Sequence, residues 1–110
     1  MNAPVSNLPW SEQFRIAANH WVDAEAAASL LEDTKSAFLA QRMAEHADLP
    51  VSRAEMTVKS SAEWVDYVTK MAAQRKEANR RKVQLEYLRM KFSEWQSHEA
   101  SARTEARLTR

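Results

Sequence analysis

Hydrophobic and polar positions follow helical spacing through most of this chain. Between Trp10 and Ala47, apolar side chains recur at steps of three, four or seven residues, the seam of a heptad pattern. The seam positions are Phe14, Ala17, Trp21, Ala24, Ala28, Leu31 and Phe38. Pro9 precedes this stretch and Pro50 follows it, and prolines commonly delimit helices. We therefore expect a helix from about residue 10 to about residue 48.

A second heptad seam begins after residue 60 and meets no Gly or Pro up to the end of the chain. Its positions are Trp64, Tyr67, Met71, Gln74, Ala78, Arg81, Leu85, Leu88, Phe92, Trp95, Glu99, Ala102 and Ala106. Ser60 followed by Glu63 matches a capping box, which marks a helix start. The pattern predicts a helix over about 61–107, with a seam that is polar at Gln74 and Arg81 and apolar at both ends.

The connector between these helices covers about residues 49–60. Ser52 with Glu55 matches another capping box and favours a short helix, whereas Thr57 and Val58 suit an extended segment. The pattern leaves both possibilities open. Residues 1–9 contain two prolines, and we expect them to be a flexible arm outside a single hairpin domain of residues 10–110.

Folding at the connector brings the two seams together, with large side chains mostly facing small ones. The expected contacts are Trp95 with Phe14, Phe92 with Ala17, Leu88 with Trp21, Leu85 with Ala24, Ala78 with Leu31 and Met71 with Phe38. In the same register Lys76 faces Asp33, and Glu77 faces Glu32. We predict an all-α fold, a long antiparallel helical hairpin that resembles a coiled coil.

A second apolar stripe lies on a neighbouring face of the later helix, at Val83, Tyr87 and Met90. A helix with two apolar stripes usually contacts two neighbours, and the seam itself is thin. We therefore expect the hairpin to self-associate, most simply as a dimer, with Val83, Tyr87 and Met90 as the oligomer face.

The composition removes most catalytic and cofactor-binding motifs. Without Gly there is no Gly-rich phosphate loop, dinucleotide fingerprint or nucleophile elbow, and without Cys there is no zinc knuckle or catalytic thiol. The histidines, His20, His46 and His98, do not converge in the predicted hairpin. Two helices also form no pocket that excludes water. We expect no enzyme activity, no catalytic residue, no metal site and no cofactor.

The charges are unevenly placed, although the formal net charge is only +1. Residues 1–50 hold three basic and seven acidic side chains, and residues 51–110 hold thirteen and eight. The densest basic run contains Arg75, Lys76, Arg80, Arg81 and Lys82. This run has two interpretations: it contacts nucleic-acid phosphates, or it pairs with acidic residues of the first helix or of another subunit. Near the C-terminus, Arg103, Arg107 and Arg110 form either a solvated helix end or a basic tip for an anionic partner.

The apolar stretches are too short to cross a bilayer, and the N-terminus lacks the pattern of a signal peptide. The sequence therefore favours a cytoplasmic protein without membrane contact.

The run from Glu77 to Phe92 and the segment from Leu49 to Glu55 resemble small helical proteins of tailed bacteriophages and prophages. The pattern that ends these proteins is matched at Trp95, Ser97, Glu99, Ala100, Arg103 and Glu105. Such proteins tend to be encoded near recombination or replication genes. The resemblance implies an accessory role in phage DNA metabolism, in the cytoplasm of the host cell, and it implies no catalytic residues.

Three functions remain in competition at this point. The first is a non-enzymatic accessory protein of DNA recombination or replication that binds DNA or DNA-processing proteins. The second is a protein-binding inhibitor or modulator of a host nuclease or defence complex. The third is a structural coiled-coil scaffold.

Overall fold

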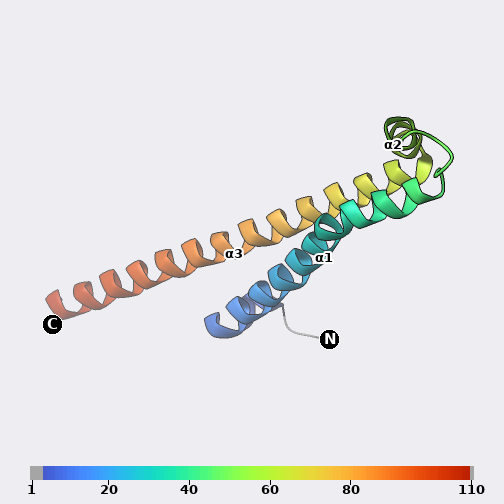
Figure 1. The fold of residues 1–110 in the computed structure, drawn as a ribbon. Coiled ribbons are helices and arrows are strands. Elements are labelled where there is room, and N and C mark those ends of the chain that lie inside the picture. Colours follow the sequence, from blue (N-terminus) through green and yellow to red (C-terminus); the bar gives the residue numbers. More distant parts are fainter. Residues whose placement is uncertain (1–3, 110) are drawn as a thin grey trace. The chain divides into compact units, whose positions relative to one another are not determined.

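The structure, a computed structural model, describes residues 4–109. These residues form a short 3-10 helix η1 (Val5–Asn7) and the α-helices α1 (Trp10–Ala44), α2 (Val51–Lys59) and α3 (Ala62–Leu108), as shown in Figure 1. No strand occurs within this part of the chain. The predicted all-α class is confirmed.

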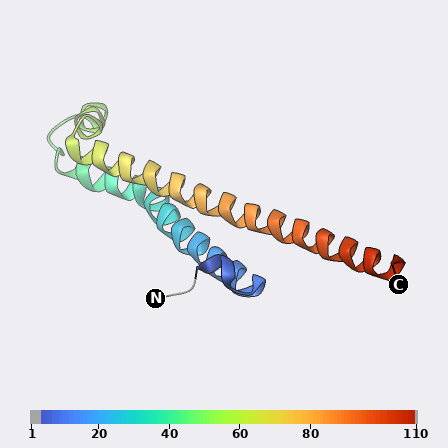
Figure 2. The same cartoon turned by 180° about the vertical axis from the view of Figure 1, so that it is seen from behind.

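The chain divides into two compact units. Unit 1 combines the chain up to Trp21 with the chain from Arg80 onward, and unit 2 is Val22–Asn79. Each unit contains a part of α1 and a part of α3. In unit 2 these parts run side by side (Figures 1 and 2), and in unit 1 the rings of Trp10 and Phe14 contact Phe92. Early residues of α1 contact late residues of α3 in each unit, so the pairing is the predicted antiparallel hairpin.

The connector is a helix for most of its length. The helix α1 ends at Ala44, four residues before the expected end, and a turn leads to Pro50. Pro50 precedes α2 without any side-chain cap, so the predicted capping box of Ser52 and Glu55 is wrong. Glu55 instead pairs with Lys59, one turn later, at 2.7 Å. The helix forms because Ala54 and Val58, one turn apart, are both buried in unit 2.

The cap of α3 is one residue later than the sequence pattern indicates. The backbone N–H of Trp64 donates to Ser61 Oγ at 3.3 Å, which makes Ser61 the capping residue. The hydroxyls of Ser60 and Ser61 both donate to carbonyls of α2, at Met56 and Val58 respectively, but only the Ser61 hydroxyl also accepts from the backbone of α3. In both views α2 is seen nearly end-on, so it crosses the adjoining ends of α1 and α3 (Figures 1 and 2).

The core of unit 2 combines small and aromatic side chains. Ala28 of α1 and Ala78 of α3 are completely buried. Phe38 stacks on Tyr67 with ring centroids 4.5 Å apart, and on the buried Trp64 at 6.2 Å. The Tyr67 hydroxyl is hydrogen-bonded to the carbonyl of Leu31, so the aromatic stack also has a polar anchor on α1.

The core of unit 1 contains the buried Leu85 and an aromatic cluster. The Phe92 ring makes T-shaped contacts with Trp10, at a centroid distance of 5.4 Å, and with Phe14, at 5.7 Å, and Trp95 stacks against Phe92 at 5.9 Å. Such edge-on contacts are favourable for aromatic rings. The first turn of α1 therefore contributes directly to this core.

The helix register differs from the prediction by about one turn. Phe14 meets Phe92 where Trp95 was expected, and Phe38 meets Tyr67 where Met71 was expected. The prediction used only the apolar heptad seam, which is compatible with either of two registers one turn apart. Stacked rings and ion pairs are compatible with only one of these registers. Within the seam, Arg75 takes the inward position that the pattern gave to Gln74, which is exposed.

The burial of Ala28 leads to a stability prediction. We expect Ala28→Leu to lower the free energy of unfolding by about 1–3 kcal/mol, because added methyl groups have no space there. Ala26→Leu is the matched control, since Ala26 lies on the exposed side of the same helix. Urea unfolding followed by circular dichroism measures both, and equal stabilities would contradict the tight contact.

Candidate functional site

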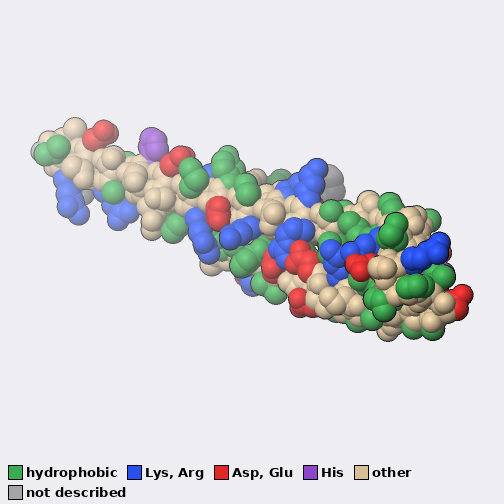
Figure 3. All heavy atoms as spheres, turned by 45° about the horizontal axis from the view of Figure 1, so that its top comes forward, with side chains coloured by type: hydrophobic (Ala, Val, Ile, Leu, Met, Phe, Trp, Pro, Cys, Tyr) green, Lys and Arg blue, Asp and Glu red, His purple; other side chains and the backbone are tan. Residues whose placement is uncertain are grey.

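Charge is distributed differently over the two units. By sequence, the residues of unit 1 include nine Lys or Arg and five Asp or Glu, whereas those of unit 2 include seven and ten. In the C-terminal part of α3, at the left of Figure 3, Lys and Arg side chains gather along one edge, and acidic and His side chains along the opposite edge. In this part of α3 the basic side chains therefore lie on one side of the helix.

The side chains of this basic face recur at a helical repeat. Lys82, Arg89 and Arg103 are separated by multiples of seven residues, and Arg107 follows Arg103 by four, so all four share one face of α3. All four are exposed, as is every described residue from 93 to 109. We call Lys82, Arg89, Arg103 and Arg107 the basic face.

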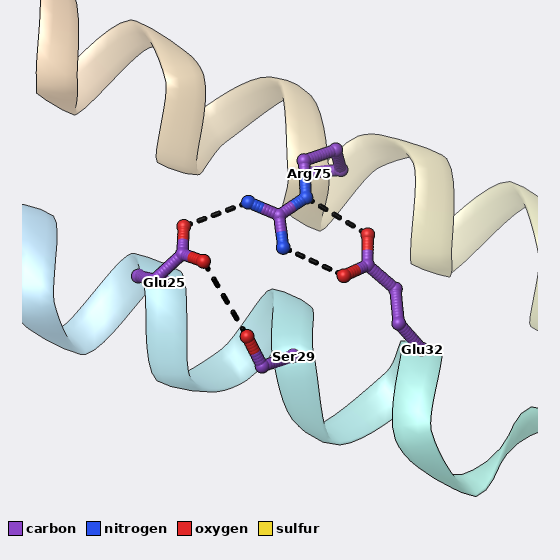
Figure 4. A network of polar contacts seen from close by, with 4 residues as sticks. All are labelled: Glu25, Ser29, Glu32 and Arg75. Atoms are coloured by element: carbon purple, nitrogen blue, oxygen red, sulfur yellow. Dashed lines mark hydrogen bonds and ion pairs between the residues drawn. The ribbon is translucent and has the colours of Figure 1, made fainter.

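Arg75, the first residue of the predicted basic run, is held inside unit 2. Its guanidinium donates two hydrogen bonds to Glu32, at 2.8 and 2.6 Å, and a third to Glu25 at 2.7 Å. Figure 4 shows Arg75 of α3 reaching between these two carboxylates of α1, with Ser29 donating to Glu25 from the same helix. For this residue the structure supports the interpretation of charge pairing between the helices.

The bridge changes the acidity of its members. Hydrogen bonds from Arg75 hold the pKa of Glu32 below its ordinary value of 4.5, despite the opposing effect of desolvation. Hydrogen bonds to Glu32 and then to Glu25 raise the pKa of Arg75 above its ordinary value. The pair thus stays ionised at neutral pH, and Glu32, which the sequence pattern placed opposite Glu77, binds Arg75.

The other residues of the run lie in different surroundings. Lys76, Arg80 and Lys82 are exposed, whereas Arg81 is half-buried and donates to Gln84 at 3.4 Å. Arg80 and Arg81 both interact with other groups of the chain. The run is therefore not one uniform patch, and of its members only Lys82 belongs to the basic face.

The predicted oligomer face is uncovered. Val83, Tyr87 and Met90 expose 62%, 61% and 62% of their surfaces. The ammonium of Lys91 lies 5.8 Å from the centre of the Tyr87 ring. Large apolar side chains at this spacing and exposure form a stripe to which a second helix can pack.

A shallow depression, which sequence reasoning did not anticipate, lies along the outer side of α2. Its lining consists of Ser52, Arg53, Glu55, Met56, Thr57, Lys59 and Ser60. These residues all belong to α2 or follow it directly, so the depression is an open surface of one helix. The sequence pattern did not distinguish a helix from an extended segment in the connector, so it could not predict which residues would share this surface.

Among residues 4–109, no group of three or more His, Cys, Asp or Glu side chains is placed to hold a metal ion. His20 and His98 are exposed, and His46 is half-buried in the other unit.

None of the helices in the described part of the chain has the length and apolar character needed to cross a membrane.

No family model, curated protein or solved structure matches this chain.

The Arg75 bridge predicts how stability depends on pH. Because the pKa of Glu32 is lower in the folded than in the unfolded chain, its contribution is complete above about pH 4.5 and is lost as the pH falls through the folded value. We expect Arg75→Gln to lower the melting temperature at pH 7, and to lower it less at pH 3. Thermal unfolding followed by circular dichroism measures both differences.

Arg89→Gln is the control, because it removes the same charge from an exposed position of α3. The pKa of Glu12 is also lowered, by its hydrogen bond from Arg15, but this pair is present in every variant and cancels in the comparison. If Arg75→Gln were equally destabilising at both pH values, a charged bridge would not be the source of the stability.

Proposed function

We propose that this protein is a non-enzymatic accessory protein of phage DNA recombination or replication, and that it binds nucleic acid through the basic face of α3. The observation that carries the proposal is the exposure of Lys82, Arg89, Arg103 and Arg107 on one side of a helix in the positively charged unit. The resemblance of the C-terminal half to phage proteins, from Glu77 to Glu105, supports the biological setting. Such a protein acts in the cytoplasm of the host cell.

The spacing of the basic face favours backbone binding. Seven residues of an α-helix span about 10 Å, so the four cations extend along the helix at intervals. Lys and Arg at such intervals neutralise phosphates without reading bases, which gives affinity that depends on salt and hardly on sequence. DNA mimicry is disfavoured, because it needs an acidic excess.

A second candidate function is protein binding, favoured by the exposed stripe of Val83, Tyr87 and Met90. The stripe suits self-association, with a dimer as the simplest form, or docking to a DNA-processing protein. It equally suits an inhibitor of a host nuclease or defence complex, and a coiled-coil scaffold. A protein of the last two kinds forms stable complexes in a pull-down and does not shift DNA at low salt.

The nucleic-acid function predicts a specific loss in salt dependence. We expect the double variant Arg103→Gln/Arg107→Gln to weaken DNA binding, and to reduce the slope of log K against log salt concentration by roughly 2, about 0.9 for each lost phosphate contact. Fluorescence anisotropy with a labelled duplex and a labelled single strand, over a range of KCl concentrations, measures both quantities.

Lys59→Gln/Lys70→Gln is the matched control, because it removes the same charge from exposed positions of unit 2. It should leave the slope unchanged. If both double variants lower the slope equally, binding follows net charge and the basic face has no special role.

A further inference from the structure

The apolar stripe of unit 1 belongs to a longer row with a charge at each end. Arg80, Val83, Tyr87, Met90 and Glu94 follow steps of three and four residues, so they lie on one face of α3. All five are exposed. We call these residues the outer row.

The outer row lies on a different side of α3 from the core of unit 1. Leu85 is buried and Phe92 contacts Trp10 and Phe14 of α1, so α1 covers that side of α3. Val83 and Met90 each lie two residues from one of these core positions, about 200° around the helix. The helix therefore has one apolar side that α1 covers and one that it leaves exposed.

The two ends of the outer row carry opposite charges, Arg80 at one end and Glu94 at the other. This asymmetry favours one orientation of a second copy packed on the row. If a second copy packed parallel, Arg80 would meet Arg80 and Glu94 would meet Glu94. If it packs antiparallel, each cationic end lies beside an anionic end, and two-fold symmetry satisfies both ends at once. Tyr87, in the middle of the row, then lies next to the symmetry axis.

We infer that a second copy of this chain packs antiparallel on the outer row, with Arg80 of each copy facing the partner's Glu94. The inference rests on the proposed self-association and specifies its geometry. Arg80 already interacts within its own chain, and a guanidinium has five N–H donors, so it can serve two acidic groups as Arg75 does.

The size of the surface sets the expected strength. Val83, Tyr87 and Met90 each expose about three fifths of their surface. Together they offer an area well below the roughly 800 Å² that each partner buries in a standard interface. We therefore expect a reversible dimer that forms in the micromolar range. At that strength the two charge pairs are a large share of the interaction, so charge reversal has a clear effect.

Sedimentation equilibrium of the full chain over a range of concentrations tests the inference. We expect Tyr87→Glu to abolish dimerisation, and Arg80→Glu or Glu94→Arg to weaken it at least tenfold, because each reversal places like charges together at both ends. The double variant Arg80→Glu/Glu94→Arg should restore the dimer to within about threefold of the natural chain. Arg89→Glu, a reversal on the basic face, is the control and should change nothing. Circular dichroism verifies that each variant is folded.

The outcomes separate the geometry from the self-association itself. A natural chain that stays monomeric at all concentrations overturns both. A dimer that neither single reversal weakens, or that the double variant does not restore, overturns the antiparallel arrangement and leaves self-association standing. DNA binding has a separate readout, so its failure does not affect this result.

Discussion

The close approach of α1 and α3 is the constraint on which unit 2 depends. Ala28 and Ala78 have only a methyl side chain. Their complete burial therefore requires that atoms of the neighbouring elements pack close to the helix backbone at these positions. This approach also positions the ion-pair bridge. Arg75 lies one turn before Ala78, and Glu25 and Glu32 lie one turn before and one turn after Ala28. A guanidinium on one helix therefore reaches two carboxylates on the other.

The chemistry of the bridge explains why the register is specific. Arg75 uses its planar fork for both oxygens of Glu32 and still has a donor for Glu25, which the point charge of a lysine does not reproduce. An apolar seam rich in alanine accepts a slip of one turn at little cost. The bridge does not, because a slip removes the fork from both carboxylates. Polar groups at a helix seam commonly select register in this way.

The sequence predicted the helices, their antiparallel pairing and several buried positions, because these follow from the period of the apolar residues. Ala28, Trp64, Ala78 and Leu85 are all seam positions and all buried. The register was wrong by a turn, since period alone does not distinguish Phe38 on Tyr67 from Phe38 on Met71.

The capping residue of α3 and the surroundings of the basic run were also not predicted correctly. Both depend on contacts between particular side chains, which the sequence pattern does not show. Ser60 and Ser61 both precede α3, and only the structure shows that Ser61 is the one that accepts from the Trp64 backbone. The basic run was identified from its composition, but composition cannot show that Arg75 turns toward α1. The exposed face that unites Lys82 with Arg103 was hidden because its members are far apart in the sequence.

The basic face and the outer row lie on different sides of α3 in unit 1. Successive residues differ by 100° around the axis, so Lys82 and Arg89 lie to one side of their neighbours Val83 and Met90. In the proposed dimer, a helix packed on the outer row would cover the apolar residues and leave the basic face exposed to water, where the proposed phosphate contacts would form. Because an antiparallel partner runs in the opposite direction, the C-terminal arginines of the two copies lie at opposite ends of the pair. The dimer proposed above would contact two separate stretches of a polyanion, because α1 covers neither the outer row nor the basic face of α3.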